Sequence, residues 1–264
     1  MELFGDLHTH TSYGHGKGTV EENVKAAIDR GLKVVAITEH GPANLFGIGV
    51  DDAEVLLKIK AEVEECRKKY KDIKILAGVE ANIIGLDGRL DVPYEILKEM
   101  DIVLAGLHLM VKTERIKDAL GLFLPNSINR WTGISLKVEC FREYLMGLNT
   151  KAVINAVNNN RIHILTHPGW GALIDTAALA EVCVQRRTAM EINVSHNPGH
   201  GYVELAKVQG VKFVINSDAH CPEDIGVLEA GLKLAEEAGL AVESIINAVN
   251  EGIGYRSFEE FVVD

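Results

Sequence analysis

The sequence has few cysteines and lacks the features of a secreted or membrane-spanning chain. Its four cysteines are far apart and form no Cys-x-x-Cys pair, so we expect free thiols in a reducing compartment. The N-terminus has no basic start followed by an apolar run, and no apolar stretch reaches the length of a membrane span. We therefore expect a cytoplasmic protein without a signal peptide.

A basic excess is also absent. The formal net charge is -11 at pH 7, whereas a protein that wraps a long nucleic acid usually needs a basic face. We therefore expect no long nucleic acid as a partner, although bound cations would still admit a small phosphorylated substrate. No Gly-x-Gly-x-x-Gly follows a predicted strand, and there is no internal repeat. The oligomeric state is left open.

What the chain does contain is a regular alternation of short apolar runs and longer helical patterns. With 264 residues and 47% hydrophobic residues it can bury a large core, and we expect one domain over residues 1–264. Strands are predicted at residues 2–7, 33–38, 73–80, 101–106, 161–166, 188–194 and 211–216. Seven apolar strands with crossover helices predict a closed or nearly closed parallel α/β barrel, and the alternative is an open doubly wound sheet.

Several helices carry clear signals at their ends. Thr19-Val20-Glu21-Glu22 is a capping box that predicts a helix ending near Gly31, and Pro93 fits the first turn of a short helix. Longer helical patterns cover residues 51–69, 135–158, 223–238 and 242–251. Residues 109–133 follow no clean period, which predicts a long loop of the kind that often forms a lid.

Histidines and carboxylates follow six of the seven predicted strands. They are His8, His10, His40, Glu80, His108, His167, Asp218 and His220. The carboxyl ends of barrel strands meet on one face, where catalysis occurs, so these side chains should converge. The paired histidines near the N-terminus are two residues apart, so they point the same way and suit one metal. Histidine with carboxylate favours zinc, manganese or iron over magnesium or calcium, which indicates a metal-dependent hydrolase.

Any one of these histidines has a simpler explanation. A lone histidine at a strand end is more often a surface or hydrogen-bonding residue, and only the repeated placement favours a metal centre. His163 lies four residues before His167, about 13 Å lower along the strand, so we expect it to be structural. His196 and His200 follow the sixth strand and belong either to the substrate pocket or to a solvated loop.

Short motifs surround the strand-end residues. They are Asp6-Leu7-His8-Thr9-His10, Thr38-Glu39-His40-Gly41, Gly78-Val79-Glu80, Gly106-Leu107-His108, Thr166-His167-Pro168-Gly169 and Ser217-Asp218-Ala219-His220. In this order they resemble the PHP family, the polymerase and histidinol phosphatase superfamily, over about residues 5–222. The resemblance implies a distorted (β/α)7 TIM-like barrel, which agrees with the strand count. It is strongest to stand-alone phosphoesterases with a three-metal site.

The resemblance also implies which residues hold metal. The three implied sets are His8, His10, Glu80 and Asp218; Glu80 again with His108 and His167; and His15, His40 and His220. The residues expected to be catalytic are His8, His10, Glu80, Asp218 and His220. The expected cofactors are two or three divalent transition metals, namely zinc, manganese or iron. His15 lies in a glycine-rich loop whose spacing varies among relatives.

Two further carboxylates are expected to support this centre. Glu39, where many relatives carry Asp, is expected just behind the ligands, and Asp6 is expected to orient a ligand histidine. Basic and aromatic residues of the predicted loop are candidates for substrate selection. They are Lys112, Arg115, Lys117, Arg130 and Trp131.

The predicted reaction is hydrolysis of a small phosphate ester, such as a histidinol-phosphatase-like reaction, by hydroxide that the metals activate. Three alternatives stay open. The first is a nuclease or phosphodiesterase acting on short oligonucleotides. The second is an amidohydrolase-like enzyme, although the chain has no obvious bridging lysine at a strand end. The third is a non-enzymatic metal-binding or polymerase-partner module, which would predict lost ligands, and none is lost in the sequence.

Overall fold

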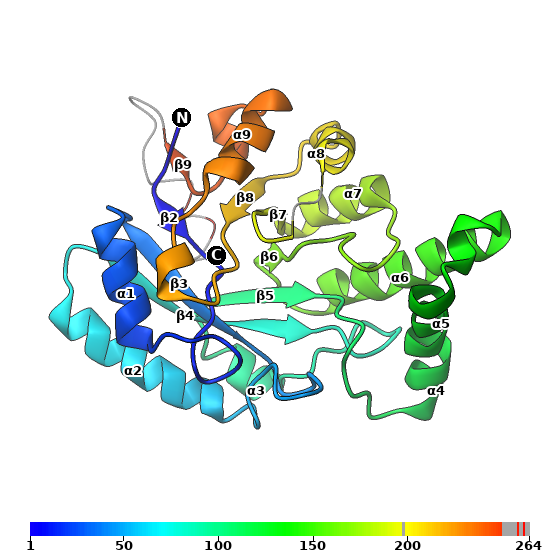
Figure 1. Cartoon of the computed structure of the whole chain (residues 1–264), viewed down its shortest axis with the longest axis horizontal. Coiled ribbons are helices and arrows are strands. Elements are labelled where there is room, and N and C mark those ends of the chain that lie inside the picture. The colour runs from blue at the N-terminus through cyan, green and yellow to red at the C-terminus, as the bar shows by residue number, and fades with distance from the viewer. Residues whose placement is uncertain (197–198, 250–257, 259–260, 262–264) are drawn as a thin grey trace.

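A computed structural model describes residues 1–196, 199–249, 258 and 261, and a seven-stranded sheet forms its centre (Figure 1). The strands are β2 (Gly5–Asp6), β3 (Val34–His40), β4 (Lys74–Asn82), β5 (Ile102–Gly106), β6 (Ile164–Leu165), β7 (Ala189–Asn193) and β8 (Phe213–Asn216). They lie in sequence order, and each pairs with the next in parallel. Each of the seven predicted strands contributes one strand to this sheet, although only the second part of the first one does so.

The two edges of this sheet meet, so the strands form a nearly closed barrel. Thr9, just after β2, forms a parallel bridge with Ala219, just after β8. Below that bridge, the Leu7 amide donates a 2.9 Å hydrogen bond to Asn216 Oδ1. The distorted (β/α)7 barrel is therefore confirmed, and the carboxyl ends of its strands form a single face.

Helices surround the barrel. They are α1 (Val20–Asp29), α2 (Val55–Lys69), α3 (Tyr94–Leu97), α6 (Glu139–Asn159), α7 (Thr176–Arg186), α8 (His200–Lys207) and α9 (Glu229–Glu237). The predicted capping box is present, because Thr19 accepts from the Glu22 amide while the Glu22 side chain accepts from the Thr19 amide. No helix in the described ranges is long and apolar enough to cross a membrane.

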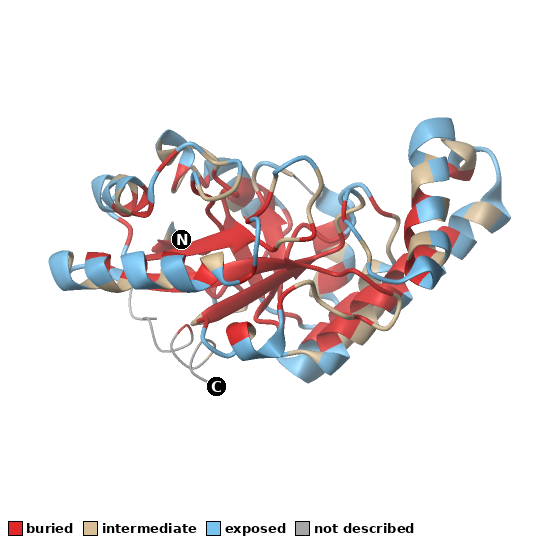
Figure 2. Cartoon of the chain, turned by 90° about the horizontal axis from the view of Figure 1, so that it is seen from below, coloured by how far each residue is buried: buried red, intermediate tan, exposed pale blue. Residues whose placement is uncertain are grey.

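The strands are buried on both faces, as Figure 2 shows. Every residue of β3 and β5 is buried, and β4 is buried except at its first residue. Apolar runs of this kind are what a covered parallel sheet requires. The cysteines are free thiols, as predicted: Cys66 and Cys183 are buried, Cys221 is partly exposed and Cys140 is exposed.

Both ends of the chain differ from the prediction. The first predicted strand is split, because β1 (Glu2–Leu3) leaves the barrel and pairs antiparallel with β9 (Ala248–Val249). The helix predicted over 242–251 is therefore wrong: Val242–Ser244 forms one 3-10 turn, and residues 250–251 lie outside the described residues. The buried Asn247 side chain donates to the Gly5 and Ile215 carbonyls, which holds this segment extended against the barrel.

The predicted loop at 109–133 is in large part helical. It contains α4 (Ile116–Asp118), a π-helical turn (Ala119–Phe123) and α5 (Leu124–Thr132), which ends at Gly133 with φ 61°. The helical period was hidden because apolar residues lie on both sides of the segment. Leu122 and Phe123 are buried, whereas other apolar side chains of the segment are exposed. The helix predicted over 223–238 is also shorter, since α9 follows a separate 3-10 turn at Pro222–Asp224.

Candidate metal centre

The nine residues that the sequence singled out as ligands form one cluster at the carboxyl ends of the strands. Glu80 is at its middle and is fully buried. His8 Nε2 lies 3.2 Å from Glu80 Oε2 and 3.1 Å from His10 Nε2. Asp218 Oδ1 lies 3.1 Å from His10 Nε2 and 3.6 Å from His8 Nε2. The two N-terminal histidines therefore face two carboxylates, as expected for one site.

The second oxygen of Glu80 faces a different pair of histidines. Glu80 Oε1 lies 3.0 Å from His167 Nε2 and 3.3 Å from His108 Nε2. The Thr166 hydroxyl donates a 2.8 Å hydrogen bond to the same oxygen. The two imidazole nitrogens are themselves 3.2 Å apart. Glu80 thus stands between two sets of nitrogen donors, with one oxygen turned toward each.

The third predicted set is arranged more loosely. The His15 ring lies 4.1 Å from the His220 ring and 5.3 Å from the His40 ring, measured between centroids. His15 is exposed, and the donor atoms that lie within 4.8 Å of one another are those of His10, His40 and His220. His40 also approaches the centre, with Nδ1 2.8 Å from Glu80 Oε2. The third set therefore overlaps the first.

Three buried polar atoms of the cluster have no hydrogen-bond partner. They are His40 Nδ1, Glu80 Oε2 and His220 Nε2. His40 and Glu80 are close, but their geometry does not make a hydrogen bond. Buried polar atoms without partners are costly, and in native proteins they mark groups whose partner is an ion, a water or a substrate. The donor set and these unpartnered atoms fit a divalent metal.

Most of the histidines have one ring nitrogen held by a neighbour and the other turned to the centre. His8 Nδ1 donates to Glu191 Oε1 at 2.8 Å, and His10 Nδ1 donates to Glu39 Oε1 at 3.2 Å. The Nδ1 atoms of three other rings meet oxygens in the same way: His108 with Asn82 at 2.7 Å, His15 with Ile48 O at 2.8 Å and His220 with Asp218 O at 2.9 Å. Such contacts fix the tautomer and leave Nε2 free to bind metal.

Glu191 and Asn82 were missed by the sequence analysis. Asn82 is the last residue of β4. Glu191 lies inside β7, where a carboxylate within the buried run Ala-Met-Glu-Ile-Asn was the available signal. Glu39 does contact a candidate ligand, as predicted. Asp6 contacts the backbone of a candidate ligand and not a histidine ring: its oxygens accept from the His8 amide at 3.5 Å, the Ser217 hydroxyl at 2.6 Å and the Gly226 amide at 2.9 Å. It therefore positions the backbone beside His8 and Asp218.

Two candidate ligands have backbone angles that are uncommon for residues with a side chain. The φ angle is 26° at His167 and 55° at Asp218. Conformations of this kind cost of order 1–3 kcal/mol and persist where the surrounding structure enforces them, often at functional sites. At both positions the angle directs a ligand atom toward Glu80 or His10.

The carboxylates of the cluster stay ionised despite their burial. Burial alone would raise the pKa of Glu80, but His40, His8 and His108 lower it well below its usual value. Burial likewise opposes ionisation of Asp218, and His8 and His10 hold its pKa well below the usual range. Burial lowers the pKa of His40 to about 3, against the raising effect of Glu80. A divalent cation would be stabilised by this surrounding charge.

A pocket of about 300 Å³ opens over the cluster. Its walls include the apolar side chains Ile48, Leu109 and Met110, and Arg130 reaches it from α5. The Trp170 indole is half-exposed and stacks on the His196 ring, with centroids 3.8 Å apart and planes 16° apart. The pocket is therefore narrow and largely apolar, with one arginine near the metal-binding residues.

A protein-family model described as the PHP domain matches residues 6–220. The chain belongs to the PHP domain family. A probable phosphatase from Thermoanaerobacter sp. strain X514 is 33% identical over 264 residues, covering 94% of this chain and 91% of that protein. A probable phosphatase from Shewanella halifaxensis is 29% identical over 286 residues, covering 100% of this chain and 98% of that protein. The family predicted from the motifs is confirmed.

Two further comparisons widen the family context. The DNA polymerase/3'-5' exonuclease PolX of Bacillus subtilis is 27% identical over 259 residues, but the match covers only 39% of that protein. A solved structure of histidinol phosphate phosphatase from Lactococcus lactis, complexed with zinc, L-histidinol and phosphate, is similar with a TM-score of 0.59 and 17% identity. The similarity covers 90% of this chain and 95% of that one, which supports the same fold.

The remaining predicted residues of this PHP chain are divided between the pocket and other surfaces. His196 lines the pocket, whereas His200 is half-exposed beside Glu204 on α8 and does not line it. Within 109–133, Arg130 lines the pocket, while Arg115 pairs with Asp87 at 2.6 Å. Other candidates of that segment, namely Lys112, Lys117 and Trp131, are exposed and do not line it. His163 stays outside the cluster, as predicted, and accepts from the Val103 amide.

Proposed function

We propose that this PHP-family chain is a metal-dependent phosphoesterase that hydrolyses a small phosphate monoester. The observation that carries the proposal is the position of Glu80. Its Oε2 lies 3.2 Å from a nitrogen of His8, and its Oε1 lies 3.0 Å from a nitrogen of His167. A carboxylate can bind two cations at once, whereas a neutral imidazole normally gives one nitrogen to one metal. This geometry is the one a bridged pair of metals needs.

The proposed ligands are the nine residues expected from the sequence, in three sets that meet at Glu80. Histidine-rich sets with carboxylates favour zinc, manganese or iron. When bound, such metals supply Lewis acidity that activates water and positive charge that stabilises a phosphoryl group in the transition state. The chain itself orients the ligands, because Glu191 fixes the His8 ring and Glu39 fixes the His10 ring.

The pocket supports a small substrate. A volume of about 300 Å³ is at the lower end of ligand pockets and suits a compact ester better than an oligonucleotide. Arg130 is the cation of the pocket that can pair with phosphate oxygens, and Trp170 offers an aromatic face to the organic group. The names of the two probable phosphatases and the ligands of the Lactococcus lactis enzyme agree with this substrate class.

The test measures metal content and turnover together. The purified protein should carry more than one transition metal per chain, up to three, and should hydrolyse p-nitrophenyl phosphate faster than bis-p-nitrophenyl phosphate or a short oligonucleotide. His8→Ala should lose metal and turnover, whereas the matched control His200→Ala should keep both. A protein that takes up no zinc or manganese on titration would rule the proposal out. Faster cleavage of the diester or the oligonucleotide would instead favour a phosphodiesterase.

Glu80→Gln tests the bridge separately, because it keeps the side-chain shape and removes the charge. Two cations a few ångströms apart repel strongly unless an anion lies between them. Glu80→Gln should therefore lose more than one metal per chain and most of the turnover, while His40→Ala should mainly reduce the third site. Full metal content with near-normal activity in Glu80→Gln would mean that Glu80 is not a bridge.

A further inference from the structure

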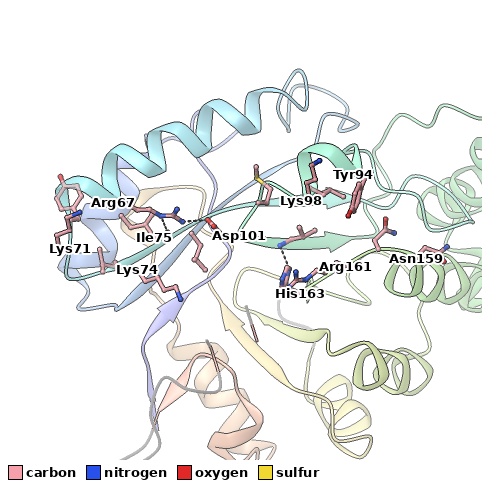
Figure 3. A pocket seen from close by; sticks show the side chains of 17 residues that line it. Arg67, Lys71, Lys74, Ile75, Tyr94, Lys98, Asp101, Asn159, Arg161 and His163 are labelled. Carbon is pink, nitrogen blue, oxygen red and sulfur yellow. Dashed lines mark hydrogen bonds and ion pairs between the residues drawn. The ribbon is translucent and has the colours of Figure 1, made fainter. Parts of the chain in front are cut away.

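A second and larger cavity lies at the opposite end of the barrel, where the strands begin (Figure 3). Its volume is about 710 Å³. It is bounded by the end of α2, the first residues of β4, the helix α3, and the segment from Asn159 to His163, which precedes β6. It shares no lining residue with the pocket over the metal cluster. We call this space the basal cavity.

The basal cavity is basic, although the whole chain has a net charge of -11. Its lining holds five basic residues and one acid, and the basic ones are Arg67, Lys71, Lys74, Lys98 and Arg161. Two of these charges are already used, because Arg67 pairs with Asp101 at 2.6 Å and Lys98 pairs with Glu95. Among the described residues, the other three cations have no ion-pair partner, and the Nζ of one of them, Lys74, lies 5.4 Å from the centre of the Phe258 ring. The uncommitted charge of the cavity is therefore positive.

A buried hydrogen-bond donor adds to this charge. His163 lines the basal cavity and is 6% exposed. Its Nδ1 accepts a 3.0 Å hydrogen bond from the Val103 amide, so the ring hydrogen is on Nε2, and Nε2 has no partner. Burial, aided by Arg161, lowers the pKa of His163 to about 4, which keeps the ring neutral at pH 7. A buried donor without a partner is uncommon in native proteins and indicates a missing acceptor.

The rest of the lining is suited to an organic molecule and not to an inorganic ion alone. Tyr94, Leu97 and Met100 give the cavity an apolar side next to the basic groups. In Figure 3, Lys71 and Lys74 lie at one end of the cavity, while Arg161 and His163 lie toward the other. Ligand pockets commonly combine an apolar wall with a few polar groups that fix orientation.

We propose that the basal cavity is a second ligand site, which binds a small organic anion carrying at least two negative charges beside an apolar body. One anionic group would accept from His163 Nε2 and pair with Arg161, and further negative charge would face Lys71 and Lys74. Charge-assisted hydrogen bonds of this kind are the strong ones. Phosphorylated metabolites and dicarboxylates share this chemistry. The proposal does not rest on the phosphoesterase function.

The experiment uses the zinc-loaded protein and follows the His163 ring by NMR, with its signal assigned from its absence in His163→Gln. Phenylphosphonate is the phosphate-like probe and isophthalate is the dicarboxylate probe. At least one of them should shift the His163 signal in a saturable way. The probe that binds more tightly shows whether the site prefers a phosphorylated compound or a dicarboxylate. No shift with either probe at millimolar concentrations would overturn the proposal.

Two double variants test whether the probe binds in the basal cavity. The double variant Lys74→Ala with Arg161→Ala should lower the affinity for the probe about tenfold or more, because each substitution removes a charged contact. Lys58→Ala with Lys151→Ala is the matched control. Both lysines are exposed and line no described pocket, and replacing them removes the same amount of positive charge. Zinc content and the unfolding temperature verify that both double variants are folded. Equal weakening in the two pairs, or none in either, would mean that the anion binds elsewhere.

Discussion

Glu191 connects the cluster of candidate ligands to the strands below it. Its Oε1 accepts from His8 Nδ1 and from the Asn216 side chain, each at 2.8 Å. Its Oε2 accepts from the His167 amide and from the Asn193 side chain, each at 2.9 Å. Burial alone would raise the pKa of this carboxyl, but His8 and His167 lower it. An ionised carboxylate is therefore the group that fits four donors.

Glu191→Gln should consequently weaken metal binding without unfolding the barrel. A glutamine amide has only one acceptor atom, so its NH2 group would face donors that the second carboxylate oxygen now satisfies. Loss of such an outer contact typically costs 10–100-fold in metal affinity or activity, and we expect a fall of about that size. Zinc affinity measured against a competing chelator tests this. Glu204→Gln, at a half-exposed carboxylate, should bind zinc normally. An unchanged affinity in Glu191→Gln would show that the His8 ring needs no carboxylate partner.

At the scale of elements, the strands could be predicted because buried parallel strands consist of continuous apolar residues. The ends of β3 and β4 also carry His40 and Glu80, so the topology of a parallel barrel was enough to expect convergence. Glu191 was missed for the opposite reason. It lies inside β7, where sequence position alone does not distinguish a supporting carboxylate from a strand-end ligand.

The elements that could not be predicted depend on distant contacts. The pairing of β1 with β9 joins residues at opposite ends of the chain, and local sequence carries no record of it. The side chain of Asn247 holds this segment against the barrel. A single asparagine within a helical pattern gives no indication of these long-range hydrogen bonds. The same holds for α5, whose packing uses Asn126, hydrogen-bonded to Asn149 of α6.

The loop after β4 offers a prediction at this scale. Gly88 has φ 78°, and a Cβ added there would lie 2.2 Å from the Ala156 amide nitrogen of α6. The asparagines Asn155 and Asn159 of α6, and Asn160 after it, donate to the carbonyls of this loop, so the loop cannot easily move away. Backbone strain and the clash together should lower the free energy of unfolding of Gly88→Ala by about 2–4 kcal/mol.

Chemical denaturation measures that loss, and Gly147→Ala is its control on α6. Gly147 is exposed, has no neighbour within 4 Å of an added Cβ and lies in an ordinary helical conformation. Alanine should therefore stabilise the helix there by about 0.5–1 kcal/mol. If both variants unfolded at the same denaturant concentration, the loop would not be fixed against α6 in the way described.

At the scale of the whole molecule, the barrel keeps two chemically opposite ends apart. One end gathers histidines and ionised carboxylates, and the other gathers lysines and arginines around the basal cavity. β4 runs from Lys74 at the basic end to Glu80 and Asn82 at the metal cluster. This separation keeps the basic groups from competing with metal for the carboxylates.

The same arrangement predicts that the stability of the fold depends on metal. Without bound metal, nothing compensates the cost of the unpartnered atoms of His40, Glu80 and His220. The same is true of the strained backbone angles at His167 and Asp218. A ligand that binds only the folded state stabilises it by about 4 kcal/mol at a thousandfold excess over its dissociation constant. For a chain of this size that predicts an unfolding temperature about 8–16 °C higher with zinc than after chelation.

Thermal unfolding of the chelated protein, with and without zinc restored, tests this dependence. The same measurement on Glu80→Gln tests whether the stabilising metal depends on Glu80. If Glu80 bridges two sites, the variant has less metal to lose, so chelation should lower its unfolding temperature by fewer degrees than in the natural chain. An equal drop in both would mean that the stabilising metal binds without Glu80. No drop in the natural chain would mean that the fold tolerates its buried ligand cluster without any cation, contrary to the cost expected for its unpartnered atoms.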